Sequence, residues 1–153
     1  MSFHLTSKTT INRPLEEIFY WVTNSENDPE WWPAVKESKC VTEVKRGVGM
    51  GYQQTAVFLG KKFDNYFECI EYEPPRRIKW TGGETMIPFV AEMFFDPVDE
   101  KNTTVRFEAE LRAPRAFRLI EPLAVAILRT QSDGFFRKLK EVMEARQPAS
   151  AGS

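Results

Sequence analysis

The sequence has few of the side chains on which metal and nucleophile chemistry depend. Its 153 residues include a single histidine, His4, and two cysteines, Cys40 and Cys69. No CxxC pair or Cys/His cluster is present, which excludes the usual zinc sites. A catalytic triad would have to use His4, which the alternation of the first strand places on the outer face. We therefore expect no metal, no cofactor, no histidine-based catalysis, and two reduced, structural cysteines.

Two further absences narrow the class of protein. Lys and Arg (21) balance Asp and Glu (22), so the net charge is −1 and no basic excess favours nucleic acid as a partner. Charged residues interrupt every apolar stretch before about 18 residues, which excludes a membrane-spanning helix. The first ten residues are polar and strand-like rather than an apolar signal sequence. We expect a cytoplasmic protein with no nucleic-acid partner, no membrane span and no obligate protein partner.

What the chain does contain is enough apolar material for one core. Hydrophobic residues make up 42% of it, and this length is usual for a single domain. Neither an internal repeat nor a linker divides the chain. We predict one domain over residues 1–146, followed by a disordered tail rich in small residues over residues 147–153.

The hydrophobic periodicity predicts a strand, short helices, six more strands and a long helix. Residues 3–11 alternate as a half-buried strand, and a helix begins at Pro14. The two prolines in residues 29–33 (PEWWP) leave room for only a short helical turn, which places Trp31 and Trp32 against the core. The six strands follow without a long helix between them, which favours an antiparallel sheet. They are expected at residues 35–44, 52–59, 62–72, 77–82, 87–96 and 103–112.

The long helix is expected over residues 121–146, with one apolar stripe that covers the sheet. The stripe consists of Leu123, Ile127, Gln131, Phe135, Leu139 and Val142. The last two strands alternate between apolar and charged residues, a pattern typical of a sheet covered on one side only. The fold class is therefore α+β, a helix-grip: a curved antiparallel sheet of about seven strands wrapped around a long C-terminal helix, with short helices after the first strand.

A hairpin turn predicted at Gly60 and Lys61 defines the inward face of the sheet. It pairs Tyr52 with Cys69 and Gln54 with Phe67. Polar residues on this face are unusual, because a buried amide without a partner costs about 1–3 kcal/mol. Together with aromatic residues they are typical of a small-molecule site. The candidate ligand-binding residues are Tyr52, Gln54, Asn65, Trp80, Phe89, Met93, Phe107, Gln131 and Phe135.

The same aromatic residues are also those of a well-filled core, and strand alternation does not distinguish a filled interior from a hollow one. Gly134 in the long helix favours space beside the sheet, although close packing explains it equally well.

Other motifs have ordinary explanations. The glycine-rich run at residues 47–51 precedes a strand, whereas a phosphate loop precedes a helix. Glu92, Glu108 and Glu110 alternate onto the charged outer face beside Arg106, where solvated charges are the simpler interpretation than paired catalytic carboxylates.

Several short motifs, taken in order, resemble those of the START-like domains of the SRPBCC superfamily. These proteins include polyketide cyclase/dehydrase-type proteins and the birch-pollen-allergen fold. The matching segments are residues 11–19 (INRPLEEIF), 29–33 (PEWWP), 47–51 (GVGMG), 72–77 (YEPPRR) and 139–144 (LKEVME). The resemblance implies a deep apolar cavity between the sheet and the long helix, used across the group for lipids, sterols, polyketides or other small hydrophobic ligands. It implies no particular catalytic residue, because the group shares no catalytic motif.

Three functions remain open at this point. The first is a binding domain for a small hydrophobic ligand such as a lipid or polyketide. The second is an enzyme of cyclase, aromatase or dehydratase type, in which Tyr52 or another inward polar group moves protons. The third is an interaction module that assists a chaperone ATPase and makes its contact through an exposed turn at Trp31 and Trp32.

Overall fold

The chain folds into one curved sheet with a long helix against it. The computed structural model describes residues 2–58, 60–82, 88–112, 119 and 121–146. The tail expected at residues 147–153 lies outside the described part of the chain. In chain order the elements are β1 (Ser2–Ile11), α1 (Leu15–Val22), η1 (Ser25–Asn27), α2 (Asp28–Trp31), β2 (Val35–Cys40), β3 (Gly51–Phe58), β4 (Lys61–Glu73), β5 (Arg77–Gly82), β6 (Phe89–Pro97), β7 (Thr103–Arg112) and α3 (Glu121–Ala145).

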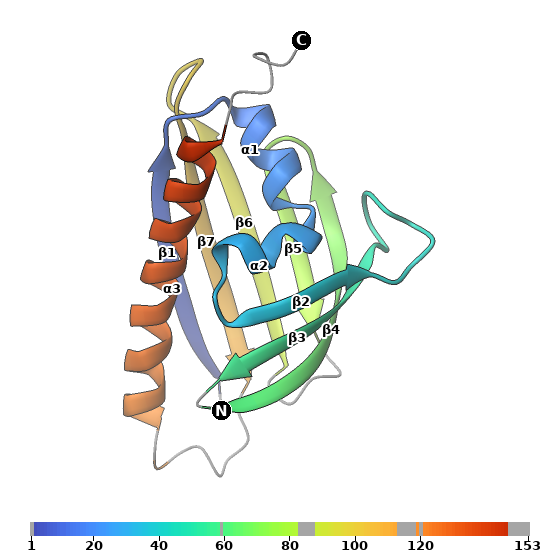
Figure 1. The fold of residues 1–153 in the computed structure, drawn as a ribbon, viewed down its shortest axis with the longest axis vertical. Helices are drawn as coiled ribbons and strands as arrows, with labels where there is room; N and C mark the ends of the chain where they lie inside the picture. Colours follow the sequence, from blue (N-terminus) through green and yellow to red (C-terminus); the bar gives the residue numbers. More distant parts are fainter. Residues whose placement is uncertain (1, 59, 83–87, 113–118, 120, 147–153) are drawn as a thin grey trace.

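The seven strands form a single antiparallel sheet in the order β1-β7-β6-β5-β4-β3-β2. Figure 1 shows the sheet curling so that β2 and β3 cross in front of the others, while α3 runs alongside β1. Helix α3 packs against β1 and α2, and α2 also packs against β2. This arrangement confirms the predicted helix-grip fold, in which the sheet and α3 enclose the interior.

The short helices begin where the local sequence predicts. Pro14 precedes the first turn of α1, and Glu16 and Glu17 lie in that turn, where the positive end of the helix dipole favours acidic side chains. Ile18 and Phe19 are fully buried on the inner face of α1. Helix α2 also has a proline in its first turn. Helix α1 packs against β6 and η1, whereas α2 packs against β2, η1 and α3, so that both lie on the inner side of the sheet with α3.

The β3–β4 register differs from the prediction by two residues. Tyr52 pairs with Phe67 and Gln54 with Asn65, so the turn precedes Lys61 and includes Gly60, whose φ is 77°. Lys61, the other expected turn position, instead pairs with Phe58 as the first residue of β4, and residue 59 lies outside the described residues. A shift of two keeps every side chain on its expected face, because alternation along a strand has a period of two. The predicted inward set is therefore unchanged.

The second strand is shorter than the predicted 35–44, because side chains replace its sheet partners. β2 ends at Cys40, whose backbone N–H donates to a carboxylate oxygen of Glu26 at 3.0 Å. Thr42 then accepts a hydrogen bond from the N–H of Gly51 through its hydroxyl oxygen at 2.9 Å. The chain leaves the sheet at this point, and β3 begins at Gly51.

The predicted apolar stripe of α3 is wrong at its N-terminal end. Leu139 is fully buried, as expected, but Leu123 is 65% exposed, and the deepest neighbours of Leu139 are Phe136 and Met143. The prediction advanced in steps of four residues, and each such step drifts by about 40° around a helix with 3.6 residues per turn. Leu123 therefore points away from the face that Leu139 presents to the sheet. No helix in the described residues is long and apolar enough to cross a membrane.

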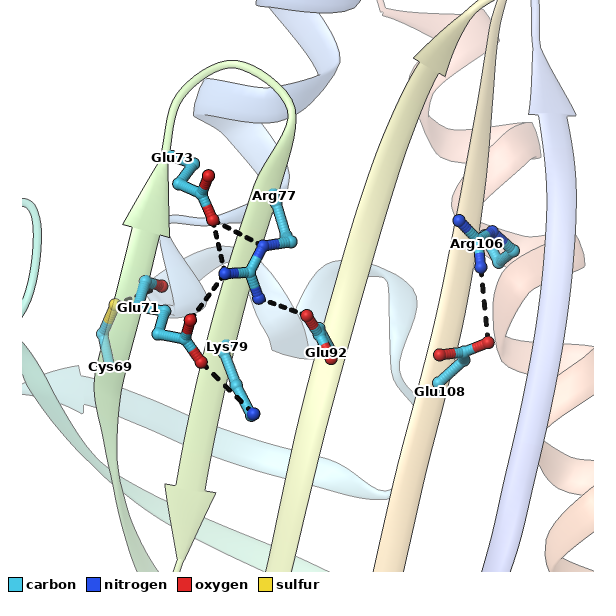
Figure 2. A network of polar contacts seen from close by, with 8 residues as sticks. All are labelled: Cys69, Glu71, Glu73, Arg77, Lys79, Glu92, Arg106 and Glu108. Carbon is cyan, nitrogen blue, oxygen red and sulfur yellow. Dashed lines mark hydrogen bonds and ion pairs between the residues drawn. The ribbon is translucent and has the colours of Figure 1, made fainter.

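Charged side chains lie on the outer face of the sheet, as the alternation predicts. Arg77 of β5 bridges to Glu71 and Glu73 of β4 and to Glu92 of β6. Figure 2 shows this network beside a separate pair, in which Arg106 lies 3.3 Å from Glu108. These contacts satisfy the charged groups locally and leave them outside the interior.

Candidate functional site

A cavity of about 260 Å³ lies between the inner face of the sheet, α2 and α3. Its walls come from all seven strands and from each of the helical segments. Most of the lining residues are aliphatic or aromatic. The polar ones are Ser25, Asp28, Gln54, Asn65 and Gln131. The described lining residues are Leu5, Val22, Ser25, Asp28, Trp31, Trp32, Ala34, Val35, Gln54, Ala56, Asn65, Phe67, Trp80, Phe89, Ala91, Met93, Phe107, Ala109, Leu111, Gln131 and Phe135.

The structure brings the candidate residues from the sequence together at this cavity, with one exception. Gln54, Asn65, Trp80, Phe89, Met93, Phe107, Gln131 and Phe135 all line it. They come from β3, β4, β5, β6, β7 and α3, so the wall depends on the whole helix-grip arrangement. Two small residues, Ala91 and Ala109, pair across β6 and β7 and leave space in the middle of the wall. The interior is therefore hollow here rather than filled.

Tyr52 is the exception, and the expectation that it reaches the cavity is wrong. Its ring stacks on Phe67, with centroids 5.6 Å apart, and meets Trp80 edge-on at 5.7 Å. Its hydroxyl points to the Met50 sulfur at 3.9 Å. Burial raises the pKa of Tyr52 to about 12, so the phenol stays protonated near neutral pH. Tyr52 faces inward but lies behind the cavity wall, where it supports Phe67 and Trp80.

The cavity contains two polar residues that the sequence did not indicate, Ser25 and Asp28, and Asp28 is the ionisable one. It is the first residue of α2 and is only 8% exposed. Gln54 donates a hydrogen bond from Nε2 to its Oδ2 at 2.7 Å. Burial raises the pKa of Asp28 to about 8, although the hydrogen bond from Gln54 acts in the opposite direction. The cavity therefore contains a carboxyl group that is mainly un-ionised at neutral pH.

The contacts of Gln54 fix the position of this carboxyl. Nε2 of Gln54 also lies 2.9 Å from Oγ of Ser38 on β2, so both of its amide protons have acceptors. The chain Ser38–Gln54–Asp28 connects β2, β3 and α2. This explains why a polar amide at position 54 is tolerated in the interior. It also leaves Oδ1 of Asp28 without a hydrogen bond from the described residues, so this oxygen is available to a ligand.

The tryptophans of residues 29–33 belong to the cavity wall. Trp31 is 2% exposed, and its ring packs on Phe136 of α3 with centroids 5.6 Å apart. Trp32 is half-buried and packs on Phe135 at 5.0 Å. The short turn thus places both rings against the core, as predicted. It contradicts the exposed Trp31–Trp32 surface that an interaction module would need.

Gly134 borders open space, but this space is not the cavity beside the sheet, because Gly134 is not among the described lining residues of the cavity. A Cβ atom at this position would meet no other atom within 4 Å, so close packing does not require glycine. A separate groove is lined by Pro33 and Gly134 and by Gln131 and Phe135. These last two residues also line the cavity. They form the wall between the cavity and this groove.

The one ionisable side chain among the described lining residues is acidic. The described lining residues include one carboxyl, Asp28, and no lysine, arginine or histidine. His4 is exposed, as the sequence predicts. Within the described part of the chain, no group of three or more His, Cys, Asp and Glu side chains is placed to hold a metal ion. The chemistry that the described lining residues can supply is therefore apolar contact, hydrogen bonds from amides and from the Ser25 hydroxyl, and a proton on Asp28.

No sequence signal identified Asp28 as an interior residue. It precedes a proline in a short polar segment, a position typical of an exposed helix start. A four-residue helix is too short for the periodicity that reveals a buried face. The nearby Trp31 offered only indirect evidence, because a buried tryptophan ring requires the neighbouring residues of the short helix to lie close to the core.

Comparison with known proteins supports the fold and the family. A family model described as polyketide cyclase / dehydrase and lipid transport matches residues 2–144. No curated protein matches the chain. The solved structure of TTHA0849 from Thermus thermophilus superposes with a TM-score of 0.81 at 19% identity, covering 95% of this chain and 100% of that one.

Two other solved structures share the same architecture. The Zhui aromatase/cyclase from Streptomyces sp. R1128 superposes with a TM-score of 0.82 at 12% identity, and both chains are covered completely. A START superfamily protein from Mycobacterium smegmatis gives a TM-score of 0.71 at 11% identity, covering 91% of this chain and 98% of that one. At these identities the likeness shows the fold alone.

The fold and the cavity define a helix-grip protein with a hollow interior. Within that class, the chain belongs to the polyketide cyclase/dehydrase and lipid transport family, whose model covers nearly all of it. The resemblance inferred from the short sequence motifs is thereby confirmed.

Proposed function

We propose that the protein binds one small, mainly apolar molecule, such as a lipid or polyketide, in the cavity between the sheet and α3. The observation that carries the proposal is the lining itself. Aromatic and aliphatic side chains surround a space in which Asp28, Asn65 and Gln131 contribute a few polar groups. A mainly apolar pocket with a few convergent polar groups is the usual form of a small-molecule site.

The size of the cavity supports a ligand of two or three rings or an equivalent chain. Its volume of about 260 Å³ exceeds the ~150 Å³ at which an apolar cavity inside a protein binds benzene. It lies near the lower end of the roughly 300–1,000 Å³ typical of drug-sized ligands. The aromatic rings of Trp80, Phe89 and Phe107 favour a ligand that is itself flat and apolar.

A second candidate function is a cyclase, aromatase or dehydratase that uses the same cavity. Asp28 favours it, because a carboxyl with a pKa of about 8 exchanges its proton near neutral pH, as an acid–base catalyst must. Ionised Asp28 would remove a proton beside a ketone, and the resulting enolate would attack a second carbonyl of the same molecule. The proton would then return from Asp28 to the new alkoxide. Tyr52 is not proposed for this role, because it lies behind the cavity wall.

Titration with a neutral, environment-sensitive naphthalene dye tests the binding function. We expect saturable binding of one dye per chain to the native protein, with a blue-shifted emission. Ala109→Phe should abolish it, because Ala109 lines the cavity. Val90→Phe, the control on the other face of the sheet where Val90 is 39% exposed, should bind as the native protein does. Equal binding to all three proteins would place the dye elsewhere and contradict the proposal.

The two candidate functions differ in what happens to a bound ketone. A binding protein returns a linear diketone unchanged, whereas a cyclase converts it to a ring and, after dehydration, releases one water. Mass spectrometry of the diketone after incubation with native protein and with Asp28→Asn distinguishes them. Conversion by the native protein that is lost in the variant would favour the enzyme. An unchanged compound that competes with the dye would favour the binding protein.

A further inference from the structure

Asp28 is the one ionisable side chain among the described lining residues of the cavity, and its hydrogen bonds leave one carboxyl oxygen available to a ligand. Oδ2 of Asp28 accepts from Gln54. No described residue makes a hydrogen bond to Oδ1. When the carboxyl carries a proton, that proton belongs on Oδ1, because Oδ2 already accepts a hydrogen bond. Gln54 has no amide proton left for a ligand, since Oγ of Ser38 accepts the other one.

We propose that Asp28 is the specificity-determining residue of the cavity: its un-ionised carboxyl donates a hydrogen bond from Oδ1 to an uncharged oxygen acceptor, such as a ketone, at the polar end of the ligand. This inference rests on the proposed binding function and names the ligand class. Burial favours the protonated carboxyl, and the described lining residues offer no cation that would hold an anionic group.

The surroundings of Asp28 contain no charge that reverses this preference. Helix α2 packs against η1, β2 and α3, and it meets β3 through Gln54. Glu26 of η1 accepts from the N–H of Cys40, and Asp133 of α3 accepts from Ser7. None of the described titratable groups on these elements forms an ion pair with Asp28. They are Glu26, Glu30, Lys36, Glu37, Lys39, Cys40, Tyr52, Arg129, Asp133, Arg137, Lys138, Lys140, Glu141 and Glu144.

Trp31 lines the same wall, but its indole N–H is not a donor that a ligand reaches. The indole nitrogen is buried, with almost no accessible surface even toward the cavity, and has no acceptor in the described part of the chain. The donor that we assign to ligand binding is therefore the carboxyl of Asp28.

Three naphthalenes of similar shape test the ligand class. Acetylnaphthalene carries a ketone, isopropylnaphthalene has no oxygen, and naphthoate carries a negative charge at the same ring position. Calorimetric titrations of the native protein at about pH 6 and pH 9 span the ionisation of Asp28. We expect the affinity for acetylnaphthalene to fall about tenfold over this range, because ionised Asp28 has no proton to donate. The affinity for isopropylnaphthalene should not change.

Asp28→Asn is the matched variant, because its amide keeps the shape of the side chain and donates at every pH. Its Oδ1 can still accept from Gln54 while Nδ2 donates to the ketone. We expect it to bind acetylnaphthalene with similar affinity at both pH values. A pH dependence that survives in Asp28→Asn would overturn the proposal, since another group would then control binding.

The native protein alone decides the question if the variant does not fold. A fall in affinity for acetylnaphthalene without a fall for isopropylnaphthalene supports the proposal. Equal pH dependence for both, or naphthoate binding as tightly as the ketone at either pH, overturns it. In those cases the cavity still binds a ligand and the proposed function stands. Failure of all three compounds to bind would refute the proposed function and this inference together.

Discussion

The side-chain amide of Gln54 donates a hydrogen bond to the buried carboxyl of Asp28 across 2.7 Å. The two residues are distant in the sequence, and their contact attaches the short helix α2 to strand β3. It holds a polar group at the wall of an otherwise apolar cavity. This contact therefore serves both the stability of the fold and the chemistry of the site.

Gln54→Met should destabilise the protein by about 1–3 kcal/mol, because it leaves the buried Asp28 carboxyl without its donor. The loss of that donor should also raise the pKa of Asp28 further, since the hydrogen bond from Gln54 lowers it. The neighbouring Gln53 is exposed on the other face of the strand, so Gln53→Met is the control and should be nearly neutral. Urea denaturation of the two variants measures the difference, and equal stabilities would show that the contact has no net effect.

The stability of the protein should depend on pH through Asp28. Its pKa of about 8 in the folded chain exceeds the ordinary value of 3.8 for an aspartate, so between these values the folded state retains a proton that the unfolded state has lost. The free energy of unfolding should therefore fall as pH rises from about 4 to about 8, by on the order of a few kcal/mol, from this group.

The variant Asp28→Asn isolates this contribution. It cannot ionise, so its stability relative to the native protein should increase as pH rises through the same range. Denaturation curves of both proteins at several pH values provide the comparison. A constant difference between the two proteins from acid to neutral pH would show that the carboxyl is not held in its un-ionised form.

Filling the cavity should abolish ligand binding with little loss of stability. Ala91 and Ala109 are paired on neighbouring strands and both line the cavity, so a phenylalanine at either position has space to occupy. Thermal melts should show Ala91→Phe and Ala109→Phe close to the native protein. A well-packed core would instead be overpacked and lose about 1–3 kcal/mol. Such a loss, without dye binding by the native protein, would mean that the space is not available.

Two leucines of α3 provide a matched test of how the helix packs. Leu139→Ala should cost about 2–5 kcal/mol, because Leu139 is fully buried and its truncation leaves a cavity. Leu123→Ala in the same helix should be nearly neutral, because Leu123 is 65% exposed. Chemical denaturation measures both. Similar costs for the two variants would contradict the orientation of α3 against the sheet.

The outer-face network should contribute more to stability than an isolated exposed pair. Arg77 contacts three glutamates from two neighbouring strands, whereas Arg106 forms an ion pair with one carboxylate, that of Glu108 (Figure 2). The guanidinium of Arg106 also lies over the ring of Phe94, 4.1 Å from its centroid. Arg77→Met should therefore lower the melting temperature more than Arg106→Met does. The difference should shrink as salt is added, because ions screen exposed charges. A difference that salt does not affect would indicate lost packing of the arginine stem instead.

The sequence predicted the fold well because the fold depends on long, periodic segments. The alternation along β6 and β7 correctly separated Ala91 and Ala109 from Glu92 and Glu108. Even the two-residue error in the β3–β4 register left Gln54 and its neighbours on the right face.

The sequence could not reveal features that depend on depth or on short segments. Alternation shows that Tyr52 faces inward but not that Phe67 and Trp80 separate it from the cavity. Asp28 escaped notice because α2 is too short to show a period, and its burial depends on contact with Gln54 from a distant strand. The volume of the interior likewise results from how α3 sits over the sheet, which no local pattern encodes.

Mass spectrometry of small molecules extracted from gently purified protein tests the central claim most directly. The native protein and Ala109→Phe should be produced and extracted in parallel, with Val90→Phe as the control. We predict that a small, mainly apolar compound is recovered from the native protein and from Val90→Phe in comparable amounts, and that it is absent from Ala109→Phe. Recovery of the same compounds from all three proteins in equal amounts would contradict a ligand site between the sheet and α3.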